Sequence, residues 1–189
     1  CHTGLETEED LLDIRSVGSL VDYDGDGDMD EGIFFEIEGM RDVLDSMMQA
    51  YSAEVAGAPI VYESANYPYF FVDTNGDGEA SEDEANFGNQ FNSWTPRLAK
   101  AAYNYQVSLK DPGRYAHGGK YVIQLIYDSI EDLNEGLGGT VDTSALRRID
   151  HGHFAGSEEA FRHWDGEEDG GIVSASCSKC HTADGLPLF

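Results

Sequence analysis

Residues 33–56, Ile33-Phe-Phe-Glu-Ile-Glu-Gly-Met-Arg-Asp-Val-Leu-Asp-Ser-Met-Met-Gln-Ala-Tyr-Ser-Ala-Glu-Val-Ala56, form the longest amphipathic stretch of the chain. Apolar side chains recur there every three or four residues, which is the period of one helix face. They are Ile37, Met40, Val43, Leu44, Met47, Tyr51 and Val55. Gly57 and Pro59 stop the pattern, so the sequence predicts one long helix over residues 33–56.

The same periodicity predicts further helices on both sides of this stretch. They cover residues 6–17, 96–109, 119–133 and 157–164. In residues 96–109, Leu98, Ala101, Ala102 and Tyr105 form the expected buried stripe. Thr95 and Pro96 suit the N-cap and first turn of that helix. Residues 60–72 are β-branched and aromatic and contain Pro68, so we expect them to be extended.

The charge of the chain restricts its partners. The 189 residues include 11 Lys and Arg but 37 Asp and Glu, which gives a formal net charge of −26. Such a charge repels nucleic acid and anionic membranes and favours cations or basic proteins. No apolar run approaches the ~18 residues of a membrane span, so we expect none.

Residues 73–84, Asp73-Thr-Asn-Gly-Asp-Gly-Glu-Ala-Ser-Glu-Asp-Glu84, match the twelve-residue calcium loop. The expected ligands are Asp73, Asn75, Asp77, Glu79 through its carbonyl, Ser81 and Glu84. Gly78 takes the sharp turn. The preceding residues look extended, so the loop is expected to lack a full helix pair. A merely solvated acidic turn is the alternative.

Residues 22–31 repeat this alternation of acidic residues. The expected calcium ligands are Asp22, Asp24, Asp26, Asp28 and Asp30. The twelfth position is Ile33, which offers no carboxylate, and Glu31 could substitute in a tighter geometry. Five carboxylates within nine residues repel one another unless a cation lies among them. A flexible acidic loop is the alternative, and for both loops we expect a structural role rather than calcium sensing.

Residues 177–181, Cys177-Ser-Lys-Cys-His181, have the C-x-x-C-H spacing of c-type haem attachment. Cys177 and Cys180 would each bond one porphyrin vinyl group, and His181 would be the proximal iron ligand. A zinc site or a thioredoxin-like dithiol is the alternative. No second Cys pair and no βαβ pattern supports either.

Cys1-His2-Thr3 repeats Cys180-His181-Thr182, and each is followed shortly by Gly-Leu. This pattern suggests the tail of another haem motif whose first Cys precedes the chain, which would make the chain a fragment of a multihaem protein. A processed lipoprotein terminus or an arbitrary start of the sequence is the alternative.

The haem iron bound by His181 needs a second axial ligand or has an open site, and the remaining histidines are candidates for that ligand. His153 and His163 precede the motif closely, with Phe154 and Trp164 beside them as an apolar wall; His117 is a further candidate, and His151 a weaker one. Met40, Met47 and Met48 have helical spacing, which favours core packing over iron ligation. Two histidine ligands favour electron transfer over oxygen chemistry.

The fold class expected is mainly α, an irregular helical body with Asp-rich calcium loops, a haem-bearing C-terminal segment and little β structure. Residues 136–140 are rich in Gly and make the best linker. The predicted domains are therefore residues 1–135, with both calcium loops and the truncated haem motif, and residues 136–189, which bind haem.

The chain resembles the large polyhaem c-type cytochromes of metal-reducing bacteria. The resemblance rests on Cys177–His181, on the His151–Phe154 and His163–Asp165 segments, and on the calcium loop with the Trp94–Gln106 segment. It implies closely packed bis-His haems along which electrons move, with other haem domains, redox proteins, and mineral or soluble acceptors as partners. One complete haem motif in 189 residues is a low density for this family.

Haem c attachment and calcium loops both belong outside the cytoplasm, so we expect a periplasmic or cell-surface location. The expected function is electron transfer, not catalysis. One alternative is an extracellular calcium-binding scaffold or adhesion module with zinc at the Cys pair. Another is a haem enzyme with an open iron site.

Overall fold

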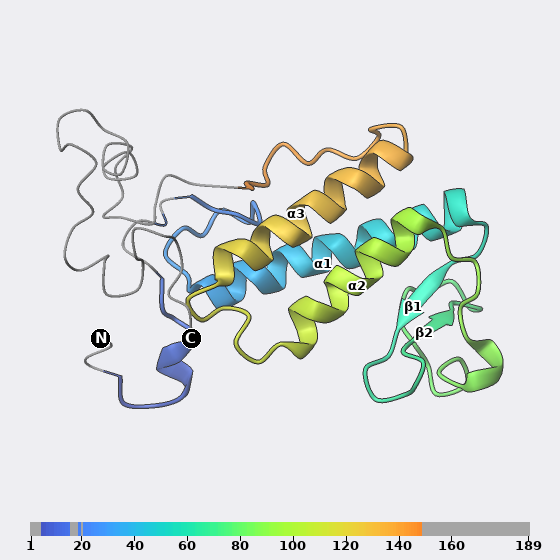
Figure 1. Ribbon diagram of the computed structural model, residues 1–189, viewed down its shortest axis with the longest axis horizontal. Helices are drawn as coiled ribbons and strands as arrows, with labels where there is room; N and C mark the ends of the chain where they lie inside the picture. Colours follow the sequence, from blue (N-terminus) through green and yellow to red (C-terminus); the bar gives the residue numbers. More distant parts are fainter. Residues whose placement is uncertain (1–4, 16–18, 20, 149–189) are drawn as a thin grey trace, which may run out of the picture. The chain divides into compact units, whose positions relative to one another are not determined.

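A computed structural model describes residues 5–15, 19 and 21–148 (Figure 1). All of these except Ser19 belong to one compact unit. Its elements are the 3₁₀ helix η1 (Glu9–Leu11), α1 (Ile33–Tyr51), the π-helical turn η2 (Ser52–Ala56), β1 (Ile60–Tyr62), β2 (Phe70–Val72), the 3₁₀ helix η3 (Phe87–Asn89), α2 (Pro96–Lys110) and α3 (Gly119–Gly136). The described part is therefore mainly helical, as predicted.

Helix α1 is the centre of this unit and packs against both α2 and α3 (Figure 1). Most of its face at the predicted spacing is buried, with Ile37, Met40 and Leu44 fully excluded from solvent, but Val55, beyond the end of α1, is 47% exposed. Met47 and Met48 lie in the same core, as their spacing predicts. The helical backbone continues through η2 to Gly57, whose φ of +85° ends it near the predicted end.

The helices α2 and α3 also agree with the sequence. The Thr95 hydroxyl accepts the Leu98 N–H and caps α2, which ends one residue beyond the prediction. All four residues of its predicted stripe are buried. Helix α3 extends three residues beyond the prediction. It buries Ile123, whereas Tyr121 is 67% exposed.

The extended segment forms a small antiparallel hairpin. Strands β1 and β2 pair with Ile60 opposite Val72 and Tyr62 opposite Phe70. Fully buried Phe71 forms a further bridge to Gln90. The hairpin leads directly into residues 73–84 and so sets where the second acidic loop begins.

The predicted helix over residues 6–17 is wrong for most of its length. Within residues 6–15, which the structure describes, only Glu9–Leu11 is helical, and none of those three residues is buried. The carboxylate of Asp10 accepts the backbone N–H groups of Glu6 and Thr7, which precede the short helix. The chain then leaves the helical path, because the Ile14 carbonyl accepts the N–H of Ile33 at 3.2 Å. Contact with the start of α1 therefore outweighs local helix propensity.

None of the helices in the described residues is long and apolar enough to cross a membrane. The helix predicted at residues 157–164 lies outside the described residues. The domain boundary at residue 136 stays a prediction.

Candidate functional site

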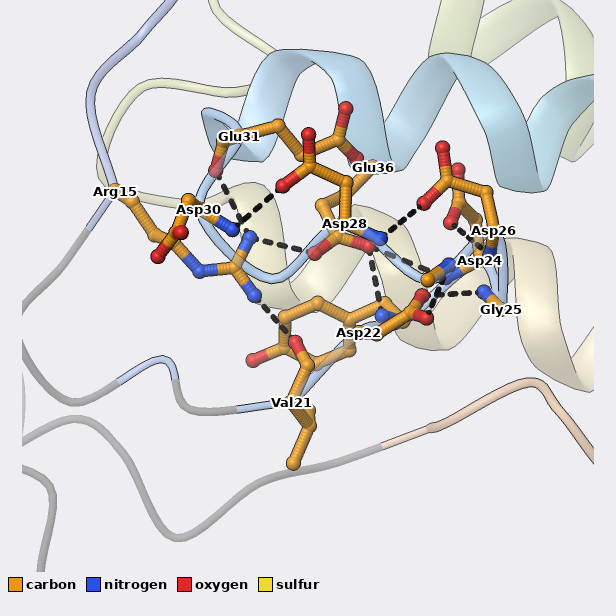
Figure 2. A network of polar contacts seen from close by, with 12 residues as sticks. Arg15, Val21, Asp22, Asp24, Gly25, Asp26, Asp28, Asp30, Glu31 and Glu36 are labelled. Atoms are coloured by element: carbon orange, nitrogen blue, oxygen red, sulfur yellow. Dashed lines mark hydrogen bonds and ion pairs between the residues drawn. The ribbon is translucent and has the colours of Figure 1, made fainter.

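The first acidic loop, residues 22–31 and here called loop 1, folds through hydrogen bonds from its backbone to its own carboxylates (Figure 2). The two oxygens of Asp22 accept the N–H groups of Gly25 and Gly27, at 2.5 and 2.8 Å. Asp24, Asp26 and Asp28 each accept the N–H two residues later, at 3.1, 2.7 and 2.9 Å. This repeated Asx-turn geometry bends the chain without help from a sheet or helix.

The second acidic loop, residues 73–84 and here called loop 2, has the same local structure. Asp73 accepts the N–H groups of Gly76 and Gly78, at 2.6 and 3.0 Å. Asn75 accepts the Asp77 N–H at 2.8 Å, as Asp24 accepts that of Asp26. All four loop glycines have positive φ, which side chains rarely adopt. The two loops are thus equivalent from their first to their sixth positions.

A buried glutamate braces each loop at an equivalent place. Glu84 accepts the N–H groups of Thr74 and Asn75, the second and third residues of loop 2. In loop 1 the same two positions donate to Glu36, at 2.7 and 3.2 Å.

Glu36 belongs to the first turn of α1, beyond the twelfth loop position. Sequence reasoning about loop spacing therefore missed it. The available signal was its place on the apolar face of α1, three residues after Ile33 and four before Met40. A lone carboxylate on a core-facing position requires a polar partner.

Glu36 also joins loop 1 to the chain before it. Arg15 donates to the Glu36 carboxylate at 2.5 Å and to the Glu31 carbonyl at 3.0 Å. It donates to the carbonyl of Val21 as well. The Arg15 and Glu36 side chains are 10% and 0% exposed, so this ion pair is buried. Residues that are distant in sequence thus meet at one carboxylate (Figure 2).

Oxygen atoms gather closely enough in both loops to hold a cation. One oxygen from each member of a group lies within 4.8 Å of the others in three groups: Asp22 with Asp24 and Glu36, Asp24 with Asp26 and Glu31, and Asp73 with Asp77 and Glu84. Carboxylate and carbonyl oxygens are the ligands that Ca²⁺ prefers. In loop 2 these groups bring together three predicted ligands, and in loop 1 they place Asp24 beside Asp22 in one group and beside Asp26 in another. Asp30 is exposed, and its N–H donates to Asp28.

Electrostatics differ between the two loops. Burial raises the pKa of Asp24 to about 7, and the charges of Asp26 and Glu36 add to this effect. Burial likewise raises the pKa of Glu31 to about 7, with Asp24 the largest charge contribution. Hydrogen bonds from Ser81 and Thr74 instead lower the pKa of Glu84 to about 2. In loop 1 the charged forms of Asp24 and Glu31 are thus disfavoured. In loop 2 the charged form of Glu84 is stabilised by hydrogen bonds from the loop itself.

Glu84 already accepts five hydrogen bonds from loop 2. Its oxygens receive the backbone N–H and hydroxyl of both Thr74 and Ser81, and also the Asn75 N–H. A carboxylate offers about four lone-pair sites, so binding calcium through both oxygens would displace some of these donors. Ser81, predicted as a ligand, uses its hydroxyl to hold Glu84 at 2.8 Å.

Among the described residues, His117 is the one histidine. It is exposed and lies in the turn between α2 and α3, with a φ of +55°. The other predicted haem residues lie outside the described residues: Cys1, His2, His153, His163, Cys177, Cys180 and His181.

Comparison with known proteins points to haem. Residues of the chain align at 34% identity over 107 residues with the C-type polyheme cytochromes OmcB and OmcC of Geobacter sulfurreducens. The aligned part is 52% of this chain. Over about half its length, this chain is similar to polyhaem c-type cytochromes.

The aligned part is only 14% of the length of each of these relatives. The chain therefore spans a small part of the curated proteins that it matches. No family model and no solved structure matches it.

Proposed function

We propose that this chain is part of a polyhaem c-type cytochrome and carries electrons through covalently bound haem. The observation that carries the proposal is the Cys177–His181 motif, in a chain whose curated relatives are polyhaem cytochromes. Cys177 and Cys180 would hold the porphyrin by thioether bonds, and His181 would bind the iron. The bound haem would supply the one-electron chemistry.

The second axial ligand and a second haem are part of the same proposal. His153, His163 and His117 are the candidates for the sixth iron position, and His2 would bind another haem together with Cys1. Two histidines per iron would leave no open position for substrate. The partners would then be other haem domains, redox proteins, or mineral or soluble electron acceptors, at the periplasmic or outer face of a cell.

Haem attachment is tested by expressing the chain in a host that matures c-type cytochromes. We expect a mass increase equal to one haem, because the pattern at Cys1 and His2 lacks the first cysteine of the motif in this sequence, and a reduced absorbance band near ~550 nm. The double variant C177A/C180A should lose both signals. The matched single variant C1A, which lacks the other cysteine, should keep the haem at the C-terminal motif. An unmodified polypeptide would refute the proposal, and bound zinc would favour the scaffold alternative.

An open iron site would instead favour a haem enzyme. Carbon monoxide binds reduced haem where the sixth position is vacant or weakly held. We expect the spectrum of the reduced protein to be unchanged by carbon monoxide. A clear shift would support the enzyme alternative over electron transfer.

The second part of the proposal is that loops 1 and 2 bind Ca²⁺ and brace the helical body. The clustered oxygens and the raised pKa values of loop 1 support it. Calcium titration by calorimetry should detect two sites, with D22N removing one and D73N the other. D111N, in a turn outside both loops, should bind calcium as the wild type does.

A further inference from the structure

Loop 2 contains an Asn-Gly pair, Asn75-Gly76, and no other asparagine of the chain precedes a glycine. In such a pair the glycine nitrogen meets little steric hindrance when it attacks the asparagine side chain, because glycine has no Cβ. The nitrogen of Gly76 would bond to Cγ of Asn75, and ammonia would leave with Nδ2. Water then opens the resulting succinimide to aspartate or isoaspartate, so the step needs no oxidant or other reagent.

The folded loop opposes this reaction at the attacking nitrogen. The N–H of Gly76 donates to Asp73 Oδ1 at 2.6 Å, a hydrogen bond to a charged acceptor. The nitrogen must lose this proton to act as a nucleophile, and the neighbouring carboxylate disfavours that loss.

The asparagine side chain is held at both ends as well. Its Oδ1 accepts the Asp77 N–H at 2.8 Å, and its Nδ2 donates to Asp77 Oδ2 at 2.9 Å. Both Asn75 and Gly76 are exposed to solvent, so water is present for hydrolysis whenever the loop opens. Solvent access therefore does not limit the reaction; the hydrogen bonds of the loop do.

Loop 1 already shows the product sequence. Asp24 occupies the place of Asn75 and makes the same contact, to the N–H two residues later. Conversion of Asn75 to aspartate would give loop 2 the Asp-x-Asp-x-Asp pattern of loop 1. It would also replace the amide that donates to Asp77 with a second carboxylate, so that the two side chains repel each other.

We propose that Asn75 is a deamidation site controlled by the folding of loop 2. While Asp73 holds the Gly76 N–H, Asn75 is protected, and opening of the loop starts the conversion. The product loop depends more strongly on a bound cation than the original loop does. This last consequence rests on the calcium binding proposed above, whereas protection by Asp73 does not.

The test is peptide mapping by mass spectrometry after incubation at mildly alkaline pH, which follows the exchange of the Asn75 amide for a carboxyl group. We expect the folded wild type to react at least about tenfold more slowly than the wild type in urea, since the hydrogen bond from Gly76 to the charged Asp73 must break before the reaction starts. D73A should approach the unfolded rate, and D73N, which retains an acceptor oxygen but loses the negative charge, should react at a rate between those of D73A and the folded wild type. D22A, the matched change in loop 1, should leave the Asn75 rate unchanged.

Equal rates in the folded and unfolded wild type would overturn the proposal, as would a D73A rate equal to that of the folded wild type. Circular dichroism of D73A separates loss of this one contact from global unfolding. If D73A is unfolded, D73N decides the matter: a rate above that of the folded wild type supports protection by Asp73, and a rate equal to it overturns the proposal. The N75D variant tests the cation consequence: its melting temperature should fall below that of the wild type in chelator and recover with Ca²⁺. If the melting temperature of N75D alone fails to behave in this way, the result counts against calcium binding and not against protection by Asp73.

Discussion

Gly39 shows how one missing side chain shapes loop 1. A Cβ at this position of α1 would lie 1.7 Å from Asp24 Oδ2, far inside van der Waals contact. The carboxylate can therefore approach the helix only because residue 39 is glycine. G39A should displace Asp24, weaken calcium binding at loop 1, and lower the free energy of unfolding by about 1–3 kcal/mol despite the better helix propensity of alanine.

Calorimetric calcium titration and urea unfolding measure these two effects of G39A. G113A is a suitable control, since a Cβ there would meet only an exposed carboxylate oxygen at an ordinary 3.4 Å. Unchanged calcium binding in G39A would show that the position of Asp24 against α1 does not matter for the cation.

The buried pair of Arg15 and Glu36 makes a second prediction at the level of single residues. E36Q keeps the shape of the side chain but leaves Arg15 without its buried counter-charge. Removing one partner of a buried pair costs about 3–5 kcal/mol, and urea unfolding should show a loss of this order. The exposed pair of Arg148 and Asp128 is the matched control, and D128N should cost less than about 1 kcal/mol. Equal losses for both variants would contradict the role of burial.

At the level of elements, an ionisable side chain lies where α1 packs against α2: Asp45 of α1 accepts a hydrogen bond from Tyr105 of α2. Burial raises the pKa of Asp45 to about 6 from its ordinary 3.8, and Asp42 adds to the shift, while Arg41 and hydrogen bonds from Gln49 and Tyr105 oppose it. The folded protein therefore holds this proton more tightly than the unfolded chain does. The contribution of Asp45 to stability rises as pH falls from about 6 to about 4, and above pH 6 its charge is a cost.

D45N should remove this dependence on pH. We expect the variant to be more stable than the wild type above pH 6, by on the order of 2 kcal/mol, and the difference to shrink as pH falls toward 4. Thermal melts across this range measure it. E54Q, a change at an exposed position beyond the end of α1, should change the melting temperature by the same amount at every pH. A constant difference between D45N and the wild type at every pH would be evidence against a raised pKa.

The secondary structure shows which elements could be predicted and why. The long helix α1 was predicted correctly because its apolar residues repeat strictly and its end is marked by Gly57 and Pro59. The helix predicted over residues 6–17 has similar spacing, yet its backbone turns away at Ile14 to bond Ile33. Periodicity reports the local helix propensity of a segment. The hydrogen bond between Ile14 and Ile33 depends instead on a residue 19 positions further along the chain.

For the whole molecule, the net charge of −26 is the dominant electrostatic fact. Like charges in a compact chain repel one another, and salt screens them with a Debye length of about 10 Å at 0.1 M. In chelator, the melting temperature should therefore rise with sodium chloride. A neutral osmolyte at equal osmolality should raise it less. A melting temperature insensitive to sodium chloride would mean that close pairs such as Arg97 with Asp132 already balance most of the repulsion.

The sequence alone determined the helical class of the described unit, and it predicted the two acidic loops and haem attachment at Cys177–His181, because each depends on residues close together in the chain. The similarity to polyhaem cytochromes agrees with the last of these. Tertiary structure decided that Glu36 braces loop 1, that Arg15 neutralises it, and that Gly39 admits Asp24. These contacts join segments that meet only after α1 has packed, so no local pattern of spacing could encode them.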